Sequence, residues 1–145
     1  MLSLSDYGAD AWSGLLVGVG SLPGSFYVAL IIGQNDPDVS VDGTTLGLYE
    51  PTDGAYARQT LGTGSSNWNG PSGGVMTSKV TITFPTALIT WGKVRGIALC
   101  DASTAGNVWA TGPADTISYV DVGDIYILDA GTIALGLSRP NDGTG

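Results

Sequence analysis

The amino-acid sequence predicts a mainly β fold, an antiparallel β-sandwich or jelly-roll-like domain of about eight strands with one N-terminal amphipathic helix. Short apolar or alternating runs recur along the chain, and turns rich in glycine, asparagine and aspartate separate them. Apolar residues make up 43% of the chain and charged residues only 12%, a balance typical of folded chains. Because no internal repeat or linker divides the sequence, we expect a single domain over residues 1–145.

A helix is expected over residues 3–19, where apolar side chains recur every three to five residues. The apolar stripe consists of Tyr7, Ala11, Trp12, Leu15 and Leu16. Ser3 followed by Asp6 resembles a capping box, and glycines beyond residue 17 end the helix. Such a helix either closes the end of its own core, which we favour, or docks into a neighbouring subunit. The side chains available for docking are Tyr7, Trp12, Leu15 and Leu16.

The β domain is expected over residues 26–137, followed by a polar tail at 138–145. Residues 26–32 and 94–100 are apolar on both faces, which is typical of strands in the middle of a sheet. Residues 79–84 alternate between apolar and polar side chains, the pattern of a half-buried strand. Shorter closing strands are predicted at 108–111, 117–120, 125–128 and 132–137.

Turn residues mark two further segments. The Asp53-Gly54 pair has aromatic residues on either side, and this arrangement predicts a β-hairpin turn. Residues 62–74 are rich in glycine, serine and asparagine, and we expect them to form a loop that carries one aromatic residue, Trp68.

The residue types that most enzymes use are nearly absent. The chain contains no histidine, one cysteine (Cys100) and one glutamate (Glu50). Without histidine, neither a Ser-His-Asp triad nor an ordinary zinc or non-haem iron site is available. Cys100 lies in an apolar run, so we expect a buried, unreactive thiol. The sequence therefore predicts a protein that is not an enzyme, with a hydrolase that uses two carboxylates as the alternative.

The formal net charge of −8 argues against two classes of partner. A polyanion is repelled by nucleic acid and by anionic membranes, so neither is expected to bind. No apolar run reaches the roughly 18 residues of a membrane span, and no signal peptide is visible. Synthesis in a bacterial cytoplasm is the simplest expectation.

A possible metal site lies in the acidic loop around residue 40. Asp36, Asp38 and Asp42 recur at alternate positions, as the oxygen ligands of a calcium loop do. However, Val41 stands where such a loop needs glycine, and Gly47 stands where it needs a bidentate glutamate. We favour a turn-rich acidic loop without a cofactor, and keep calcium as a weak alternative.

Four side chains are candidates for contact with a partner or a glycan. They are Tyr56, Arg58, Trp68 and Trp109. A tryptophan among serine, asparagine and glycine is typical of binding surfaces, although Trp68 is also able to fold back over a sheet edge, which we favour. Arg58 has an alternative as an ordinary surface ion pair with Glu50 or Asp53. Trp109 lies on a short predicted strand, and the sequence leaves open whether its side chain faces the core or the surface.

Several phrases, in order along the chain, resemble a known family. They are Leu4-Ser5-Asp6-Tyr7, Phe26-Tyr27-Val28-Ala29-Leu30, Gly54-Ala55-Tyr56-Ala57-Arg58, Asn67-Trp68, Ile82-Thr83-Phe84-Pro85, Trp91-Gly92-Lys93-Val94, Ile97-Ala98-Leu99-Cys100-Asp101-Ala102 and Gly106-Asn107. Together they resemble the small minor tail or tail-fibre-like virion structural proteins of tailed bacteriophages. The resemblance runs from about residue 4 to residue 137 and carries over no catalytic residue.

The resemblance implies a structural role in the phage particle. It predicts contacts with other virion proteins, and we expect a homo-oligomer, with a trimer as the first guess because such particle parts commonly have cyclic symmetry. The tail or its tip is the expected location in the virion. Two alternatives stay open: a capsid decoration protein, and a module that binds carbohydrate or a host receptor for host attachment.

Overall fold

Two long apolar segments form the centre of the largest sheet in the computed structural model, which describes residues 1–33 and 41–137. They are β2 (Ser25–Ile32) and β7 (Gly92–Cys100), and they pair antiparallel with each other. The sheet has the order β1-β8-β7-β2-β3. Its other strands are β1 (Ser3–Leu4), β3 (Gln59–Gly62) and β8 (Val108–Val120).

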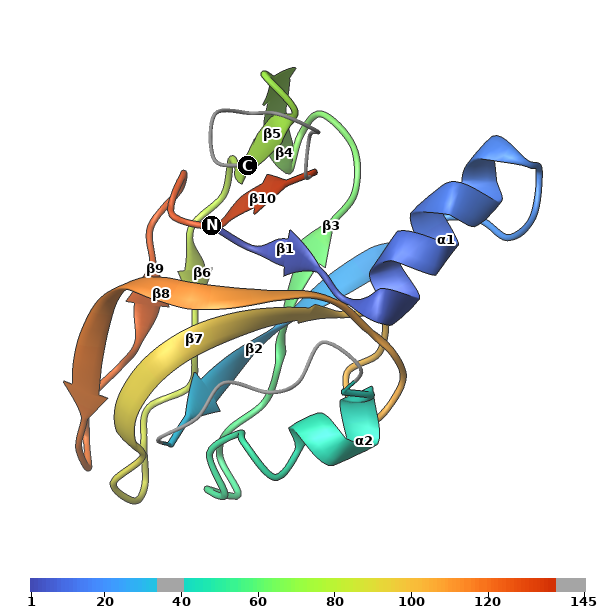
Figure 1. Ribbon diagram of the computed structural model, residues 1–145. Coiled ribbons are helices and arrows are strands. Elements are labelled where there is room, and N and C mark those ends of the chain that lie inside the picture. Colours follow the sequence, from blue (N-terminus) through green and yellow to red (C-terminus); the bar gives the residue numbers. More distant parts are fainter. Residues whose placement is uncertain (34–40, 138–145) are drawn as a thin grey trace, which may run out of the picture.

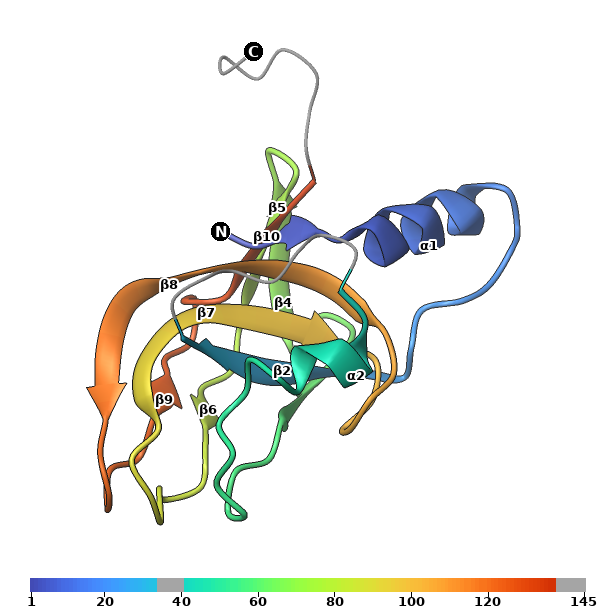
Figure 2. The same ribbon diagram turned by 60° about the horizontal axis from the view of Figure 1, so that its bottom comes forward.

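Two smaller sheets lie across one face of the large sheet (Figures 1 and 2). One has the order β10-β5-β4 and the other pairs β6 with β9. Their strands are β4 (Trp68–Ser72), β5 (Val75–Ser78), β6 (Ile82–Thr83), β9 (Ile127–Leu128) and β10 (Ala134–Gly136). The main core fills the space between the layers, where Val28, Leu30 and Leu99 pack with Ile82, Phe84 and Leu128. The predicted mainly β, antiparallel fold is confirmed.

The other face of the large sheet is covered by the short helix α2 (Gly43–Leu46) and its flanking loops. Ala29 and Ile31 on β2 pack there with Leu46 on α2. Ala98 and Cys100 on β7 belong to the same cluster. The central strands are therefore buried on both faces, as their unbroken apolar runs predict.

The N-terminal helix α1 (Asp6–Leu16) is shorter than the predicted 3–19 because the chain first forms β1. Ser3 pairs with Thr111 on β8, so it does not cap the helix as predicted. Ser5 is the N-cap: its Oγ accepts a hydrogen bond from the Gly8 N–H at 3.0 Å and donates one to the Val108 carbonyl. The cap therefore also fixes the helix to β8.

Gly8 is the point at which α1 approaches the large sheet most closely. A Cβ at this position would lie 2.0 Å from the Trp109 carbonyl oxygen, and a carbonyl in a paired strand has little freedom to move. Alanine normally stabilises a helix interior by roughly 0.5–1 kcal/mol relative to glycine. Here the close contact makes alanine destabilising instead of stabilising. We expect Gly8→Ala to lower the free energy of unfolding by about 1–3 kcal/mol, measured by urea titration.

Ser13→Ala is the matched control for Gly8→Ala, because Ser13 is an exposed residue of the same helix. This control is expected to change the free energy of unfolding by less than about 0.5 kcal/mol. A stabilising Gly8→Ala would contradict the close approach of α1 to β8.

Two predicted segments have different structures. The expected loop over residues 62–74 contains β4 and continues into β5, because Gly73 and Gly74, both with positive φ, form the two-residue turn of a hairpin. The predicted hairpin at Asp53-Gly54 does not form, and residues 51–58 connect to β3 without a strand. The alternation over residues 79–84 is confirmed, since Ile82 and Phe84 are buried while Thr81 and Thr83 are exposed.

The predicted strands at 108–111 and 117–120 are one long strand, β8. The register between β7 and β8 shifts between Val94 and Gly96, and this irregularity lies opposite the gap between the two predicted strands. Neither helix of the described residues combines the length and the apolar character that crossing a bilayer requires.

Candidate functional site

Arg58 is a buried side chain that ties three segments together. Its Nε and Nη2 groups donate to the two carboxylate oxygens of Glu50 at 3.0 and 2.9 Å. Nη1 donates to the carbonyls of Ala102 and Ala105, and Nη2 also donates to the carbonyl of Gly43. All five N–H groups of the guanidinium are thereby used. The predicted alternative of an ion pair with Glu50 forms, but it is buried and not at the surface, since Arg58 is only 8% exposed. Because all its donors bind within the chain, Arg58 has none left for the predicted partner contact.

Tyr56 belongs to the same buried network. Its hydroxyl donates to Glu50 Oε1 at 2.7 Å and accepts a hydrogen bond from the Leu30 N–H on β2 at 3.0 Å. Its ring stacks on Phe84 and meets Trp91 edge-on. Burial, reinforced by the negative charge of Glu50, raises the pKa of Tyr56 well above its ordinary value. The phenol hydroxyl is therefore a structural group, whereas Tyr56 also lines an open pocket, so its contact with a partner stays a prediction.

Asp53 fixes a second loop in place through its carboxylate. Oδ1 accepts from the Ala55 N–H at 2.9 Å, and Oδ2 accepts from the Trp91 indole N–H at 2.9 Å. Oδ2 also accepts from the Leu88 N–H at 2.6 Å and the Ile89 N–H at 3.2 Å. The Ala55 and Trp91 hydrogen bonds contribute most to holding the pKa of Asp53 at about 2, below its ordinary value of 3.8.

This lowered pKa makes the contribution of Asp53 to stability depend on pH. The ionised form is favoured in the folded state, so its contribution is complete above pH 3.8 and is lost as the pH falls towards 2. We expect Asp53→Asn to be less stable than the wild type at pH 7, with a difference that shrinks as the pH is lowered from 5 to 2. Thermal unfolding over this range measures it, and a constant difference would contradict the assignment.

Trp109 lies in the core at the base of α1 and is only 4% exposed. Its ring meets Tyr7 and Phe26 edge-on, with centroid distances of 5.7 and 5.4 Å. Its indole N–H donates to Asp101 Oδ2 at 3.3 Å. Of the two orientations left open from the sequence, the structure therefore has the inward one, and the predicted partner contact at Trp109 is wrong.

Trp68 is half-buried and packs against the edge of the core. Its indole N–H donates to the Gly62 carbonyl on β3 at 2.9 Å, so the side chain folds back over the edge strand, as one of the two predicted alternatives proposed. The same side chain also lines an open groove with a volume of about 250 Å³. We call this space the tryptophan groove; its apolar lining consists of Trp12, Leu22, Phe26, Trp68, Pro71, Met76 and Leu135.

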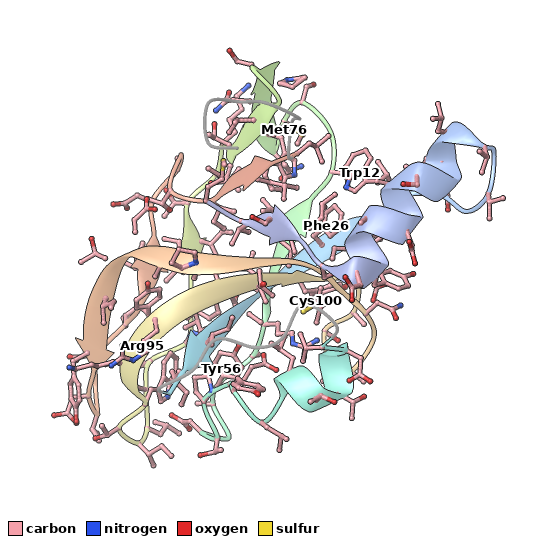
Figure 3. The ribbon with its side chains drawn as sticks, in the orientation of Figure 1. Trp12, Phe26, Tyr56, Met76, Arg95 and Cys100 are labelled. Atoms are coloured by element: carbon pink, nitrogen blue, oxygen red, sulfur yellow. The ribbon has the colours of Figure 1, made fainter. Side chains whose placement is uncertain are left out.

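Helix α1 forms one wall of the tryptophan groove. Figure 3 shows Trp12, Phe26 and Met76 around the space between α1 and β5. The N-terminal half of the helix packs on β1 and β8, whereas its C-terminal end projects from the body of the protein (Figures 1 and 2). Of the predicted docking residues, Trp12 and Leu15 are half-buried, Tyr7 is 43% exposed and Leu16 is 90% exposed. The helix thus packs on its own core at one end and leaves its other end free.

We call the projecting apolar residues Leu16, Val17 and Val19 the α1 tip. Val17 is 74% exposed and Val19 is 66% exposed. Sequence reasoning included Leu16 but missed Val17, Val19 and the groove residues Leu22 and Met76. The sequence feature that indicates this apolar surface is the absence of any Asp, Glu, Lys or Arg between residues 11 and 33.

A second exposed apolar surface lies at the opposite end of the molecule, where β8 ends (Figures 1 and 2). Its side chains are between 47% and 66% exposed, and they are Leu88, Ile89, Ile117, Tyr119, Val122, Ile125 and Ile127. Hydrogen bonds join the turns that carry them, from Thr90 Oγ1 to Asp121 Oδ1 and from the Gly123 N–H to the Ala87 carbonyl. Large exposed apolar surfaces on soluble domains commonly mark contact sites.

Asp42 and the single thiol, Cys100, have structural positions in the described residues. Asp36 and Asp38 lie outside the described residues, and Asp42 is the N-cap of α2, where its Oδ1 accepts from the Thr45 N–H at 2.7 Å. This hydrogen bond lowers the pKa of Asp42. Cys100 is fully buried on β7, and burial raises the pKa of its thiol to about 12.

The model of the family described as podophage GP4 fiber I protein gp80 matches residues 3–136. The protein belongs to this family. The matched range contains all ten strands and both helices, so the family relationship covers the entire described fold. Among curated proteins, none matches the chain.

Membership in the podophage GP4 fiber I family confirms the resemblance to tail-fibre-like virion proteins that the sequence indicated. The protein is a fibre-type virion protein of a bacteriophage. The residues that match the family model include both exposed apolar surfaces of the molecule. One is the α1 tip with the tryptophan groove, and the other is the surface at the end of β8.

Proposed function

We propose that the protein is a non-enzymatic structural component of the phage tail or tail tip, where it makes protein–protein contacts as a homo-oligomer. One observation carries this proposal: a member of a fibre family exposes apolar side chains at two opposite ends. A subunit that joins two neighbours needs two such surfaces, whereas an isolated domain has no use for them. A trimer is the oligomer that we expect first.

The way the carboxylates are used supports a role without catalysis. Glu50 is engaged by Arg58 and Tyr56, and Asp53 by four N–H groups. Asp101 accepts hydrogen bonds from Asn107 and Trp109. Carboxylate catalysis needs a pair with separated pKa values facing a substrate. These three groups instead hold loops in place.

Analytical ultracentrifugation of the purified protein, combined with immunogold labelling of intact particles, tests the proposal. We expect a defined oligomer in solution and label on the tail. A strict monomer that is also absent from particles would contradict it, and label confined to the capsid would favour a decoration protein instead.

Binding of a host glycan is the second candidate function, because Trp12 and Trp68 both line the tryptophan groove. Aromatic faces stack on sugars, but recognition also needs polar groups placed to fix the ligand. Apart from the two indoles, the polar side chains that line the groove are those of Thr63 and Ser65, and the Trp68 N–H already binds Gly62. We therefore favour a protein contact; glycan-array binding that is lost on Trp68→Ala would reverse this preference.

A further inference from the structure

The charged residues are distributed unevenly over the chain. Residues 11–33, 59–78 and 130–137 contain no Asp, Glu, Lys or Arg. These three segments supply the C-terminal part of α1 and the strands β4, β5 and β10, which lie together around the tryptophan groove. The groove and the α1 tip therefore belong to a region built from segments without carboxylates, and the charged group at the groove rim is the ammonium of Lys79, whose Nζ donates to the Ser65 carbonyl at 3.3 Å.

This distribution selects the kind of partner that fits. A cationic partner would be attracted to the acidic surfaces and would gain nothing from the region without carboxylates. Two copies of this chain, each with a formal charge of −8, repel each other wherever their carboxylates meet. They approach with least repulsion through the region from which carboxylates are absent. The cationic Lys79 at the groove rim also complements the negative charge of a second copy, so electrostatics favours a second copy as the partner.

The groove lacks an occupant from its own chain. Its lining is predominantly apolar, and the described residues of the same chain leave it open. The α1 tip is attached to the same helix as Trp12, yet Leu16 and Val17 are 90% and 74% exposed and do not enter the groove. Each copy therefore presents an unfilled apolar groove and an uncovered apolar projection of matching chemistry.

We propose that the α1 tip of one copy occupies the tryptophan groove of a second copy. This inference rests on the homo-oligomer of the proposed function and names the surface that forms it. Leu16 and Val17 of one copy then pack against Trp68 and Met76 of the next. Because tip and groove lie side by side on α1, the contact is either reciprocal between two copies related by a two-fold axis or head-to-tail, and a head-to-tail contact closes into a ring when the rotation between copies allows.

Cross-linking between two distinguishable chains tests the contact directly. A tagged chain with Leu16→Cys is co-expressed with an untagged chain that carries Ser65→Cys at the exposed rim of the groove. The native Cys100 is buried and does not compete. After capture on the tag and treatment with a short bismaleimide, we expect a heterodimer band on a denaturing gel. The control pairs Leu16→Cys with Tyr119→Cys at the far end; an equal band there, or no band with Ser65→Cys, overturns the proposal.

A matched pair of surface variants provides the second test. Leu16→Ser removes the most exposed side chain of the tip, and Leu48→Ser removes an 85% exposed leucine from a different surface. Because both side chains are exposed, both variants are expected to fold. Leu16→Ser should raise the dissociation constant of the oligomer about tenfold, as loss of one buried leucine does, and Leu48→Ser should leave it unchanged.

The outcomes separate this inference from the proposed function. A wild-type protein that stays monomeric overturns both. An oligomer whose dissociation constant is unaffected by Leu16→Ser overturns the tip-in-groove contact and leaves the proposed function in place. Glycan binding that requires Trp68, in an oligomer insensitive to Leu16→Ser, also overturns the contact and assigns the groove to a sugar.

Discussion

Replacing Arg58 with methionine is expected to lower the free energy of unfolding by about 3–5 kcal/mol, because one partner of a buried ion pair is removed. Methionine fills much of the space of the arginine stem but donates no hydrogen bond. Glu50, 7% exposed, is then left as a buried carboxylate with Tyr56 as its remaining partner. The carbonyls of Gly43, Ala102 and Ala105 lose their donor in the same step. Urea titration followed by tryptophan fluorescence measures the loss.

Three further variants identify the cause of that loss. Arg58→Lys keeps the charge but lacks the planar fork of five donors, so we expect an intermediate loss of stability. Glu50→Gln alone leaves the guanidinium buried without its counter-charge. The double variant Glu50→Gln with Arg58→Met is expected to lose less than the sum of the two single variants, since no unpaired charge remains. Strict additivity would contradict a coupled buried pair.

The burial of this pair shows why the sequence predicts the strands better than the site. The apolar runs that become β2 and β7 have a local signal, because a strand buried on both faces needs apolar residues at every position. The partners of Arg58 come from segments 8 to 47 residues away. The Glu50–Arg58 pairing was among the predicted alternatives. However, the sequence around these two residues does not show that α2 and the turn before β8 cover the pair.

Glycine caused the clearest differences between the predicted and observed elements. The sequence interpretation treated Gly73-Gly74 as part of a loop, although two consecutive residues with positive φ are what a tight hairpin turn requires. Conversely, Gly112 lies between the two predicted strands 108–111 and 117–120 but is inside β8, where its carbonyl passes close to Gly96 on β7. Whether a glycine ends a strand or lets two backbones approach depends on the neighbouring strand, and this information is not local.

The tryptophans show the same limit at the level of side chains. Asn67 directly precedes Trp68 and Asn107 lies two residues before Trp109, so their local sequences do not distinguish a core indole from a surface one. What separates them is the neighbour supplied by the fold. Trp109 lies under α1 in the large sheet, whereas Trp68 lies at the edge, where one side of the indole stays open to the groove.

Replacing Trp109 with alanine is therefore expected to lower the free energy of unfolding by about 3–5 kcal/mol, as truncation of a buried tryptophan does. Urea titration followed by circular dichroism measures this loss without depending on the removed fluorophore. Trp109→Phe is the matched control, because it keeps a ring between Tyr7 and Phe26 and gives up only volume and the hydrogen bond to Asp101. Its loss should be clearly smaller.

Trp109→Ala also tests how α1 is anchored. The helix is held at its N-terminal half by the Tyr7 contact, by Gly8 against the Trp109 backbone and by the Ser5 cap on β8. Removing the indole takes away the first of these supports, so the helix that carries the α1 tip becomes less fixed. At protein concentrations where the variant is still folded, we expect weaker self-association than in Trp109→Phe. Unchanged stability in Trp109→Ala would contradict this anchoring and return the indole to the surface.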